Sequence, residues 1–498
     1  MFSDITKFSI FLKLNVYNIY FTTFMFFFFI IIFLIGNKFS LWVASNRIIM
    51  FKNAILCVFT LSFILFLFYF FIIVHFKNMI LIQNYVYCNY TFNYLNKFVL
   101  DTSDIIIIYL CYLIGFVSII TLGDRFWGAN YHLSLLFLYF TIIINLLCQS
   151  VSLFELFIFY ELLLLPSILF VYKSGYTKKS HQANIYFFIW TQLGSLFVLF
   201  GILYISAACG TTDFLFIKNF HFTKTESYYL YLLFFFGFGV KVPLWPLHFW
   251  LIKVHVEAPS GFSIFLSGFL VKSAVYCFYK IVTLFSINSF YLLPVLFCFM
   301  GMLDSSLKMW MQVDIKKLIA YATVQEMNAI FLLFNFGDSW AINAGLVFLL
   351  THGILSALMF FLVECLYKRF NSRSLFKVYG ISQIYPNLGV AIWAMLIIFF
   401  GFPGTLKFYV EIQLVMILAY NDLFAAFFIL VIFIFINVIG FGRCWFSILY
   451  GNPCYSEELI NVTAESTKVT MDLTREESLV IALLVFLSVT PSFFIFLL

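Results

Sequence analysis

Charged side chains are scarce in this sequence. Asp, Glu, Lys and Arg make up 10% of its 498 residues, while 64% are hydrophobic. Soluble proteins have about 25% charged and about 45–50% apolar residues. So few charges cannot cover the surface of a chain this long. A water-soluble fold is therefore excluded, and the mean hydropathy of +1.06 indicates a protein that is mostly embedded in the lipid bilayer. The net charge of +6 is no sign of nucleic-acid binding.

Motifs that bind metals or redox cofactors are missing as well. The ten cysteines include no C-x-x-C pair, so the sequence indicates no zinc ribbon, no disulfide framework and no iron–sulfur cluster. A Gly-rich dinucleotide-binding fingerprint is absent too. We therefore expect this chain to bind no cofactor and no metal, and its cysteines to serve mainly as apolar residues within helices.

Long apolar runs, by contrast, are abundant. Taking about 20 apolar residues as one bilayer crossing, we predict an all-α polytopic membrane protein with about 14 transmembrane helices. These are expected near residues 17–36, 53–75, 104–122, 132–152, 153–172, 184–206, 229–252, 261–284, 289–306, 317–336, 340–366, 387–420, 423–446 and 478–498.

Lysines and arginines are unevenly distributed between the two sides of this predicted bundle. Of the 28 basic residues, those in loops after odd-numbered helices outnumber those on the opposite side by more than two to one. Because basic loops collect on the inner side of a membrane, both termini are predicted to lie on the outer side. The first residues, MFSDITKFSI, lack the Arg-rich amphipathic character of a presequence. Together with a composition typical of AT-rich genomes, this indicates an organelle-encoded protein.

Five ionisable side chains interrupt the apolar spans: Glu161, Lys241, Lys272, His352 and Glu411. A charge near the bilayer centre costs about 2.5–3.5 kcal/mol on insertion scales, so such residues generally face the protein interior and mark an ion path or a buried pair. Each of the five can take up or release a proton, and no two have metal-binding spacing on one helix. The sequence thus predicts proton transfer along a line of buried charges, with purely structural buried pairs as the alternative.

Helix-breaking residues lie beside two of these charges. Pro243 and Pro246 follow Lys241, and the Gly-Phe-Pro-Gly segment at 401–404 precedes Glu411. Proline removes a helix hydrogen bond and clashes with the preceding turn. We therefore expect helices 7 and 12 to be interrupted at membrane depth, where the freed backbone groups must meet protein or water rather than lipid.

The two interrupted helices occupy corresponding places in two blocks of five helices. If helices 4–8 and 9–13 form an inverted repeat, as in transporters, each interruption falls in the fourth helix of its block. This divides the chain into helices 1–3 (residues 1–130), a first repeat (131–286), a second repeat (287–447), and a polar loop with helix 14 (448–498).

Glu161 and Lys241 could control proton transfer by moving together and apart. At a separation of about 4 Å and an effective dielectric constant of about 20, their attraction is about 4 kcal/mol. Separating the pair removes this attraction and changes how firmly Lys241 holds its proton, which Lys272 could receive or pass on through internal water. In this hypothesis no redox cofactor is needed in the chain itself.

The segment VKVPLWPLHFWLIKVHVEAPSGFS at 240–263 resembles VKxPxxxxHxWLPxAHVEAPxxGS, a signature of the subunit 4 family of NADH dehydrogenase, the respiratory complex I. The resemblance extends over about residues 155–415. Further similar segments are FYELLLLP (159–166), LGSL (193–196), DIKKLIAYATV (314–324), THGILSALMFFLVECLYKR (351–369) and GFPGTLKFYVE (401–411), the last of which resembles LPGxxxFxGE.

The resemblance implies an antiporter-like, proton-translocating membrane-arm subunit of the mitochondrial inner membrane. It would belong to an enzyme, NADH:ubiquinone reductase, in which NADH, FMN, iron–sulfur clusters and ubiquinone bind to partner subunits. The implied neighbours are other membrane-arm subunits, especially the subunit 5 and subunit 2 paralogues. Subunit 4 is favoured by Lys272, where subunit 5 typically has histidine, and by Glu411, where the paralogues usually have lysine.

The resemblance also implies a role for each buried charge. Glu161 and Lys241 would form a coupling ion pair, and Lys272 would be the central relay. His352 would continue the axis, and Glu411 would be its terminal group.

The sequence departs from the family pattern at several positions. The family usually reads SxSHM after the IAY segment, whereas Glu326 stands here in place of the histidine, which puts a relay role for this position in doubt. Ile252 replaces the proline of WLP and Phe262 interrupts a run of small residues; we interpret both as packing variation. Lys407 could extend to the membrane surface, pair with Glu411 or join the proton path.

Two other functions stay open at this point. A free-standing cation/proton antiporter subunit would share the same core, and it would show sodium-dependent exchange without flavin or iron–sulfur absorbance. A non-conducting scaffold of the membrane arm would keep its proton stoichiometry when Lys272 is replaced. The complete set of five titratable residues argues against the scaffold.

Overall fold

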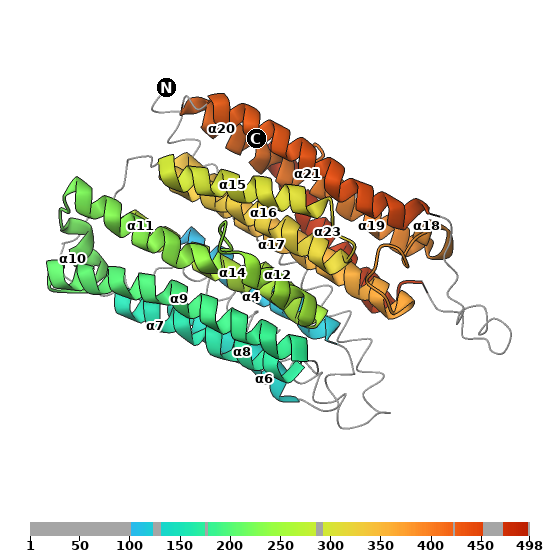
Figure 1. Cartoon of the computed structure of the whole chain (residues 1–498), viewed down its shortest axis with the longest axis horizontal. Coiled ribbons are helices and arrows are strands. Elements are labelled where there is room, and N and C mark those ends of the chain that lie inside the picture. The colour runs from blue at the N-terminus through green and yellow to red at the C-terminus, as the bar shows by residue number, and fades with distance from the viewer. Residues whose placement is uncertain are drawn as a thin grey trace, which may run out of the picture.

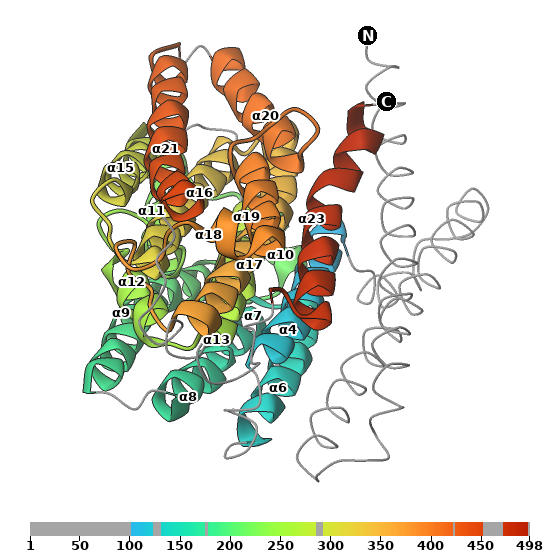
Figure 2. The same cartoon turned by 90° about the vertical axis from the view of Figure 1, so that its right-hand side faces the viewer.

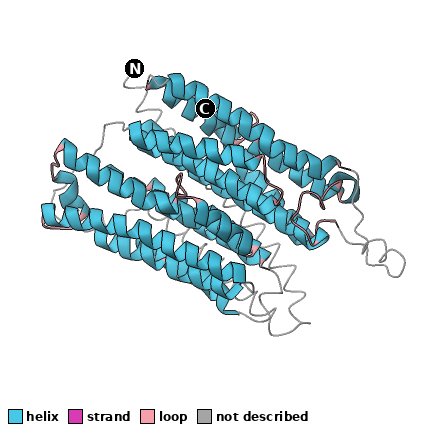
Figure 3. Ribbon diagram, in the orientation of Figure 1, coloured by secondary structure: helices cyan, strands magenta, loops and turns pink. Residues whose placement is uncertain are grey.

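A computed structural model of the chain describes residues 101–122, 131–174, 178–284, 292–421, 424–451 and 472–496 (Figure 1). Every regular element in these ranges is a helix, so the all-α prediction is confirmed (Figure 3). Within the same ranges, seven helical stretches are long and apolar enough to cross a membrane. The helices predicted at 17–36 and 53–75 lie outside the described residues, and the total helix number stays a prediction.

Most spans predicted to be continuous form single helices. These are α4 (Thr102–Thr121), α6 (Tyr131–Cys148), α9 (Lys178–Cys209), α15 (Leu292–Met309), α16 (Ile315–Phe336), α17 (Ser339–Phe370), α21 (Phe424–Tyr450) and α23 (Arg475–Phe496). Short helices α10 (Phe214–Asn219) and α18 (Ile381–Ile384) lie in connections. Helices α16 and α17 both end at a residue with left-handed backbone, Gly337 and Asn371, which is a common way to stop a helix.

Both predicted interruptions are present. Helix α11 (Lys224–Lys241) is separated from α12 (Phe249–Glu257) by the segment that contains the two prolines. Helix α19 (Pro386–Phe399) is separated from α20 (Leu406–Tyr420) by residues 400–405, where Gly401 has φ +64° and Gly404 has φ +98°. These left-handed conformations strain any residue with a Cβ, which explains glycine at these two positions.

Two further irregularities were not predicted. The span near 153–172 consists of α7 (Leu153–Leu162) and α8 (Leu164–Ser174), which meet at Leu163. In the span near 261–284, a five-residue π-helical segment, η2 (Leu266–Leu270), joins α13 (Ser260–Phe265) to α14 (Val271–Leu284). Such π segments are often found at functional sites, and this one ends two residues before Lys272.

Helix α17 lies at the centre of the bundle. It packs against α4, α13, η2, α16, α19, α20 and α23, and Figure 1 shows it running through the middle of the molecule. Small residues allow the closest approaches: a Cβ added at Gly353 would lie 2.8 Å from Leu110 of α4, and one at Gly268 of η2 would lie 2.5 Å from Ile114. Three segments distant in sequence are thereby held together around the middle of α17.

Much of the exposed surface of the described helices is apolar. Helix α9, for example, exposes Ile185 (58%), Ile189 (55%) and Phe200 (60%), whereas an exposed apolar surface of this extent is rare in a soluble monomer. Several polar and ionisable side chains are instead buried, among them Lys272 and His352. This arrangement is expected for a protein surrounded by lipid.

Two isolated antiparallel β-bridges connect the loops at corresponding positions of the predicted repeats. Ser152, before α7, pairs with Asp213, and Asp314, before α16, pairs with Ser374. In the predicted numbering, each bridge joins the start of the second helix of a block to the connection between its third and fourth helices. Figure 2 shows the bundle from a second side, with α15 and α16 beside α21. The division at residues 131–286 and 287–447 stays a prediction.

Candidate functional site

The backbone groups freed at the first interruption are bound by side chains. The indole Nε1 of Trp250 donates a hydrogen bond of 2.8 Å to the carbonyl of Val240, and Nδ2 of Asn328 donates one of 3.3 Å to the carbonyl of Pro243. An unpaired backbone group in lipid would cost several kcal/mol. As expected, side chains in the protein interior bind the backbone carbonyls freed at the break beside Lys241.

Lys241 is the last residue of α11 and is 5% exposed. Its ammonium lies 3.6 Å from the centre of the Tyr160 ring and donates a hydrogen bond of 3.4 Å to the Tyr160 carbonyl. A buried cation is stabilised by the negative face of an aromatic ring. The C-terminal end of α11 adds a favourable negative potential.

Glu161 follows Tyr160 on α7 and is bound from another side. Nε2 of Gln192 on α9 donates a hydrogen bond of 3.1 Å to the Glu161 carboxylate. Both Glu161 and Lys241 belong to the described part of the chain, and they form no direct ion pair with each other. The structure therefore has the two charges in a separated arrangement, with Tyr160 and Gln192 as their partners.

Lys272 is completely buried and lies in the first turn of α14. Its ammonium donates a hydrogen bond to the carbonyl of Ser267, a residue of η2. Lys272 also interacts electrostatically with Glu326 of α16 and with His352 of α17. The lysine predicted to be the central relay thus lies within electrostatic range of Glu326 and His352.

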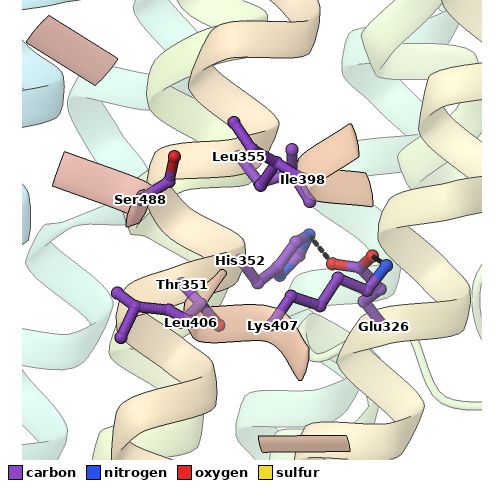
Figure 4. A pocket seen from close by; sticks show the side chains of 8 residues that line it. All are labelled: Glu326, Thr351, His352, Leu355, Ile398, Leu406, Lys407 and Ser488. Carbon is purple, nitrogen blue, oxygen red and sulfur yellow. Dashed lines mark hydrogen bonds and ion pairs between the residues drawn. The ribbon is translucent and has the colours of Figure 1, made fainter. Parts of the chain in front are cut away.

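Beyond Lys272, a cluster of ionisable residues lies where α16, α17 and α20 meet (Figure 4). Nε2 of His352 is 3.9 Å from Oε2 of Glu326, and the ammonium of Lys407 is 2.5 Å from Oε1 of Glu326. The side chains of Glu326 and Lys407 are 3% and 4% exposed. This is a buried ion pair with a histidine at its other side.

Lys407 has partners on both sides of the second interruption. Besides Glu326, it donates a hydrogen bond of 2.7 Å to the carbonyl of Phe399, the last residue of α19, and lies 3.7 Å from the carboxylate of Glu411. The carbonyl is available because a helix leaves its last carbonyls without an intrahelical partner. A Cβ at Gly401 would lie only 2.6 Å from Oε2 of Glu411, so glycine provides the space for this carboxylate.

Sequence reasoning did not include Glu326 and Lys407 among the five site residues. The same signal that identified the others was present, because both are charges within predicted spans. Their pairing could not be predicted from the sequence, because they are 81 residues apart. Of the three roles considered for Lys407, pairing with Glu411 is present in the structure.

A second buried cluster, which the sequence analysis also missed, lies at the far end of α14. The hydroxyl of Tyr276 donates a hydrogen bond of 2.6 Å to the carboxylate of Asp104, and Lys280 lies 3.5 Å from the same carboxylate. Lys280 also donates a hydrogen bond of 2.9 Å to the carbonyl of Cys148. Tyr276 and Lys280 are four and eight residues beyond Lys272, so this cluster lies about one to two helical turns from Lys272.

Metal ligands do not gather in the part of the chain that the structure describes. Its His, Cys, Asp and Glu residues form no group of three or more that could hold a metal ion. The clusters contain ammonium groups in direct contact with the carboxylates, as Lys407 is with Glu326, and an ammonium cannot share a carboxylate with a metal without repulsion.

Comparison with known families gives a match over residues 150–439, to the family described as NADH:quinone oxidoreductase/Mrp antiporter, transmembrane. This chain belongs to that family. The matched region begins before α7 and ends within α21, so it includes both interrupted helices and all five predicted site residues. The resemblance inferred from the motifs is confirmed.

Similar curated proteins are named NADH-ubiquinone oxidoreductase chain 4. The protein of Paramecium tetraurelia is 42% identical over 76% of this chain and 80% of its own length. That of Acanthamoeba castellanii is 32% identical over 64% of this chain and 63% of its own length. That of Arabidopsis thaliana is 30% identical, with 60% of each chain covered.

Solved structures show the same fold. The Mrp complex from a Dietzia species matches with a TM-score of 0.66 and 22% identity, over 72% of this chain and 68% of that one. The membrane-bound sulfane sulfur reductase, an archaeal respiratory membrane complex, matches with a TM-score of 0.67 and 18% identity, over 78% of this chain and 64% of that one. The antiporter-like membrane fold predicted from the sequence is thereby confirmed.

Proposed function

We propose that this chain is a proton-translocating membrane-arm subunit of respiratory complex I, which couples NADH oxidation by ubiquinone to proton pumping. The single observation that carries the proposal is the series of buried or partly buried ionisable groups inside the bundle, most of them close to a break or irregularity in a helix. The series runs from Glu161 and Lys241 through Lys272 to the cluster of His352 and Glu411. The relatives named chain 4 of NADH-ubiquinone oxidoreductase support the assignment.

In this proposal, Glu161 and Lys241 act as the coupling pair. The separated arrangement is one of its two states, with the ammonium over the Tyr160 ring. Two unit charges that approach from about 8 Å to about 4 Å double their attraction, from about 2 to about 4 kcal/mol at an effective dielectric constant of about 20. A movement of one flexible side chain would therefore change how firmly Lys241 holds its proton.

Lys272 acts as the central relay between the two halves. Within the described residues, its side chain donates a hydrogen bond to the Ser267 carbonyl, which accepts from either an ammonium or a neutral amine. This partner holds the nitrogen in place without fixing its charge. The amine can then gain a proton from the side of Lys241 and release one toward His352, which continues the axis to Glu411.

The redox chemistry belongs to other subunits in this proposal. NADH, FMN, iron–sulfur clusters and ubiquinone would bind to partners, and the neighbouring membrane-arm subunits would include the subunit 5 and subunit 2 paralogues. The protein would lie in the mitochondrial inner membrane with both termini on the intermembrane-space side, which the distribution of basic residues between the loops supports.

Replacement of Lys272 in the assembled complex tests the proposal. For Lys272→Met, reconstituted in proteoliposomes, we expect the rate of NADH-driven proton pumping to fall by about tenfold or more, because a general acid–base group contributes about 10²–10⁴ in rate. Lys253→Met is the matched control, since Lys253 is exposed and lies 3.5 Å over the Tyr186 ring. Normal pumping and stoichiometry in Lys272→Met would contradict the proposal and favour the scaffold.

A cation/proton antiporter subunit is the second candidate, favoured by the likeness to the Mrp complex. Purification in the native membrane distinguishes the two. Co-migration with flavin and iron–sulfur absorbance supports complex I, whereas sodium-dependent proton exchange in fractions without these chromophores supports the antiporter.

A further inference from the structure

The residues Glu326, Lys407, Glu411 and His352 form a compact unit, here called the carboxylate cluster. Its members come from α16, α17 and α20. Figure 4 shows His352 and Lys407 on opposite sides of the Glu326 carboxylate, in a pocket walled by Leu355, Ile398 and Leu406. The pocket is too narrow to admit a water molecule, so the side chains themselves must satisfy one another's charges.

The two oxygens of Glu326 have different surroundings. Oε1 is bound by Lys407, while Oε2 is buried and makes no hydrogen bond within the described part of the chain. The ring nitrogens of His352 are likewise buried and without a hydrogen-bond partner there. A buried polar atom without a partner is costly and demands an explanation. Here Oε2 of Glu326 faces Nε2 of the His352 imidazole across 3.9 Å. A small approach of the two side chains would bring these atoms to hydrogen-bond distance, as proton transfer between them requires.

Charge balance shows where an exchangeable proton can reside. The groups that face Glu326 are Lys407, Glu411, His352 and, at longer range, Lys272. Lys272 and the four members of the carboxylate cluster together have no net charge when both lysines are protonated, both carboxylates are ionised and the histidine is neutral. When Lys272 gives up its proton, these five groups stay neutral only if the carboxylate cluster takes that proton. An uncompensated charge in a buried site is strongly unfavourable, so the proton lost by Lys272 moves into the cluster.

We propose that Glu326 is an additional proton-carrying residue of this subunit, which receives the proton of Lys272 through His352, and that Lys407 is the counter-ion it shares with Glu411. Lys272 loses one proton and the Glu326 carboxylate gains one. Lys407, released from Glu326, then pairs with Glu411. When Glu326 passes its proton onward, Lys407 returns to it and Lys272 takes up a new proton, so that the five groups together again have no net charge.

The position of Lys407 fits this role. Its ammonium already lies within 4 Å of both carboxylates, at 2.5 Å from Glu326 and 3.7 Å from Glu411. Glu411 is one turn further along the same helix, so a rotation within the flexible lysine side chain exchanges one partner for the other. The Phe399 carbonyl binds the ammonium at 2.7 Å and can serve as its pivot.

The inference rests on the proposed function and is tested in the same assembled complex with two variants. For Glu326→Gln we expect NADH-driven pumping to fall by about tenfold or more, as for loss of an acid–base group. For the double variant Glu326→Gln with Lys407→Met, which removes both charges, we expect the same loss. If the pair were only structural, removing both charges would restore pumping, and this result would overturn the inference.

Controls separate an assembly defect from a transfer defect. The partly exposed pair Asp304 and Lys308, 2.6 Å apart, is neutralised in parallel as Asp304→Asn with Lys308→Met and is expected to leave pumping unchanged. Glu326→Asp keeps an acid one methylene shorter, and we expect it to assemble and to pump faster than Glu326→Gln. Infrared difference spectra of the wild-type complex should contain an NADH-dependent band of a protonated carboxylic acid, absent from Glu326→Gln. Presence of the same band in Glu326→Gln contradicts the inference.

The outcome for Lys272→Met distinguishes the two proposals. If Lys272→Met abolishes pumping and Glu326→Gln pumps normally, the proposed function holds and the role of Glu326 is wrong. If both variants pump normally, the proposed function itself is wrong.

Discussion

The hydroxyl of Tyr276 donates a hydrogen bond of 2.6 Å to the carboxylate of Asp104 and thereby ties α14 to the first described helix, α4. The other carboxylate oxygen accepts a hydrogen bond of 2.9 Å from the backbone N–H of Asp101, which closes the start of α4. With Lys280 at 3.5 Å, the site is an anchored ion pair. Helix α14, which carries Lys272, is therefore fixed to α4 by contacts beyond Lys272, on the side away from η2.

Loss of this anchor should destabilise the subunit. For Asp104→Ala we expect a loss of about 3 kcal/mol or more in folding stability, because removing one partner of a buried ion pair leaves the other uncompensated. Thermal denaturation of the purified complex measures the effect. Asp338→Ala is the control, since Asp338 is exposed at the start of α17 and its side chain makes no capping hydrogen bond; a comparable loss there would contradict the explanation.

The Tyr160 ring should be needed for the separated state of the coupling pair. A desolvated cation–π contact is worth about 2 kcal/mol, so Tyr160→Leu removes a main partner of Lys241 and shifts its ammonium toward Glu161. We expect slower NADH-driven pumping in Tyr160→Leu and nearly normal pumping in Tyr160→Phe, which retains the ring. Equal rates in the two variants would show that the ring has no such role.

Gly401 should be sensitive to the smallest substitution. Gly401→Ala forces a residue with a Cβ into the left-handed region, at a cost of about 1–2 kcal/mol, and places the new methyl group against the Glu411 carboxylate. We expect both lower thermal stability and slower pumping. Gly210→Ala is the matched control, because Gly210 has φ +72° and nothing within 4 Å of an added Cβ. It should lose stability and keep its pumping rate.

The two interrupted helices could be predicted because proline and glycine act on their own chain neighbours. Pro243 and Gly401 mark the breaks directly in the sequence. The π segment could not be predicted in this way. Its sequence, LSGFL, contains no local breaker comparable to proline, and Gly268 is instead required by the close approach of Ile114, more than a hundred residues earlier.

The individual charges were predictable, but their partners were not. An ionisable residue in an apolar run is visible at once, and Glu161, Lys241, Lys272 and His352 were identified on that basis. Which charges meet depends on the packing of distant helices, as for Lys407 with Glu326. The expected direct contact of Glu161 with Lys241 is absent from this arrangement because the Tyr160 ring, adjacent to Glu161 in the chain, binds the ammonium.

The π-helical winding of residues 266–270 determines the directions in which the side chains of α14 point around the helix axis. An α-helix turns by about 100° per residue, and a π turn covers the same circle with more residues, so the later side chains point elsewhere than a regular helix would direct them. Removing a single amino acid from this stretch would swing the Lys272 ammonium by about 100° around the helix axis. The direction in which the Lys272 side chain points is thus set by the π-helical segment that precedes it.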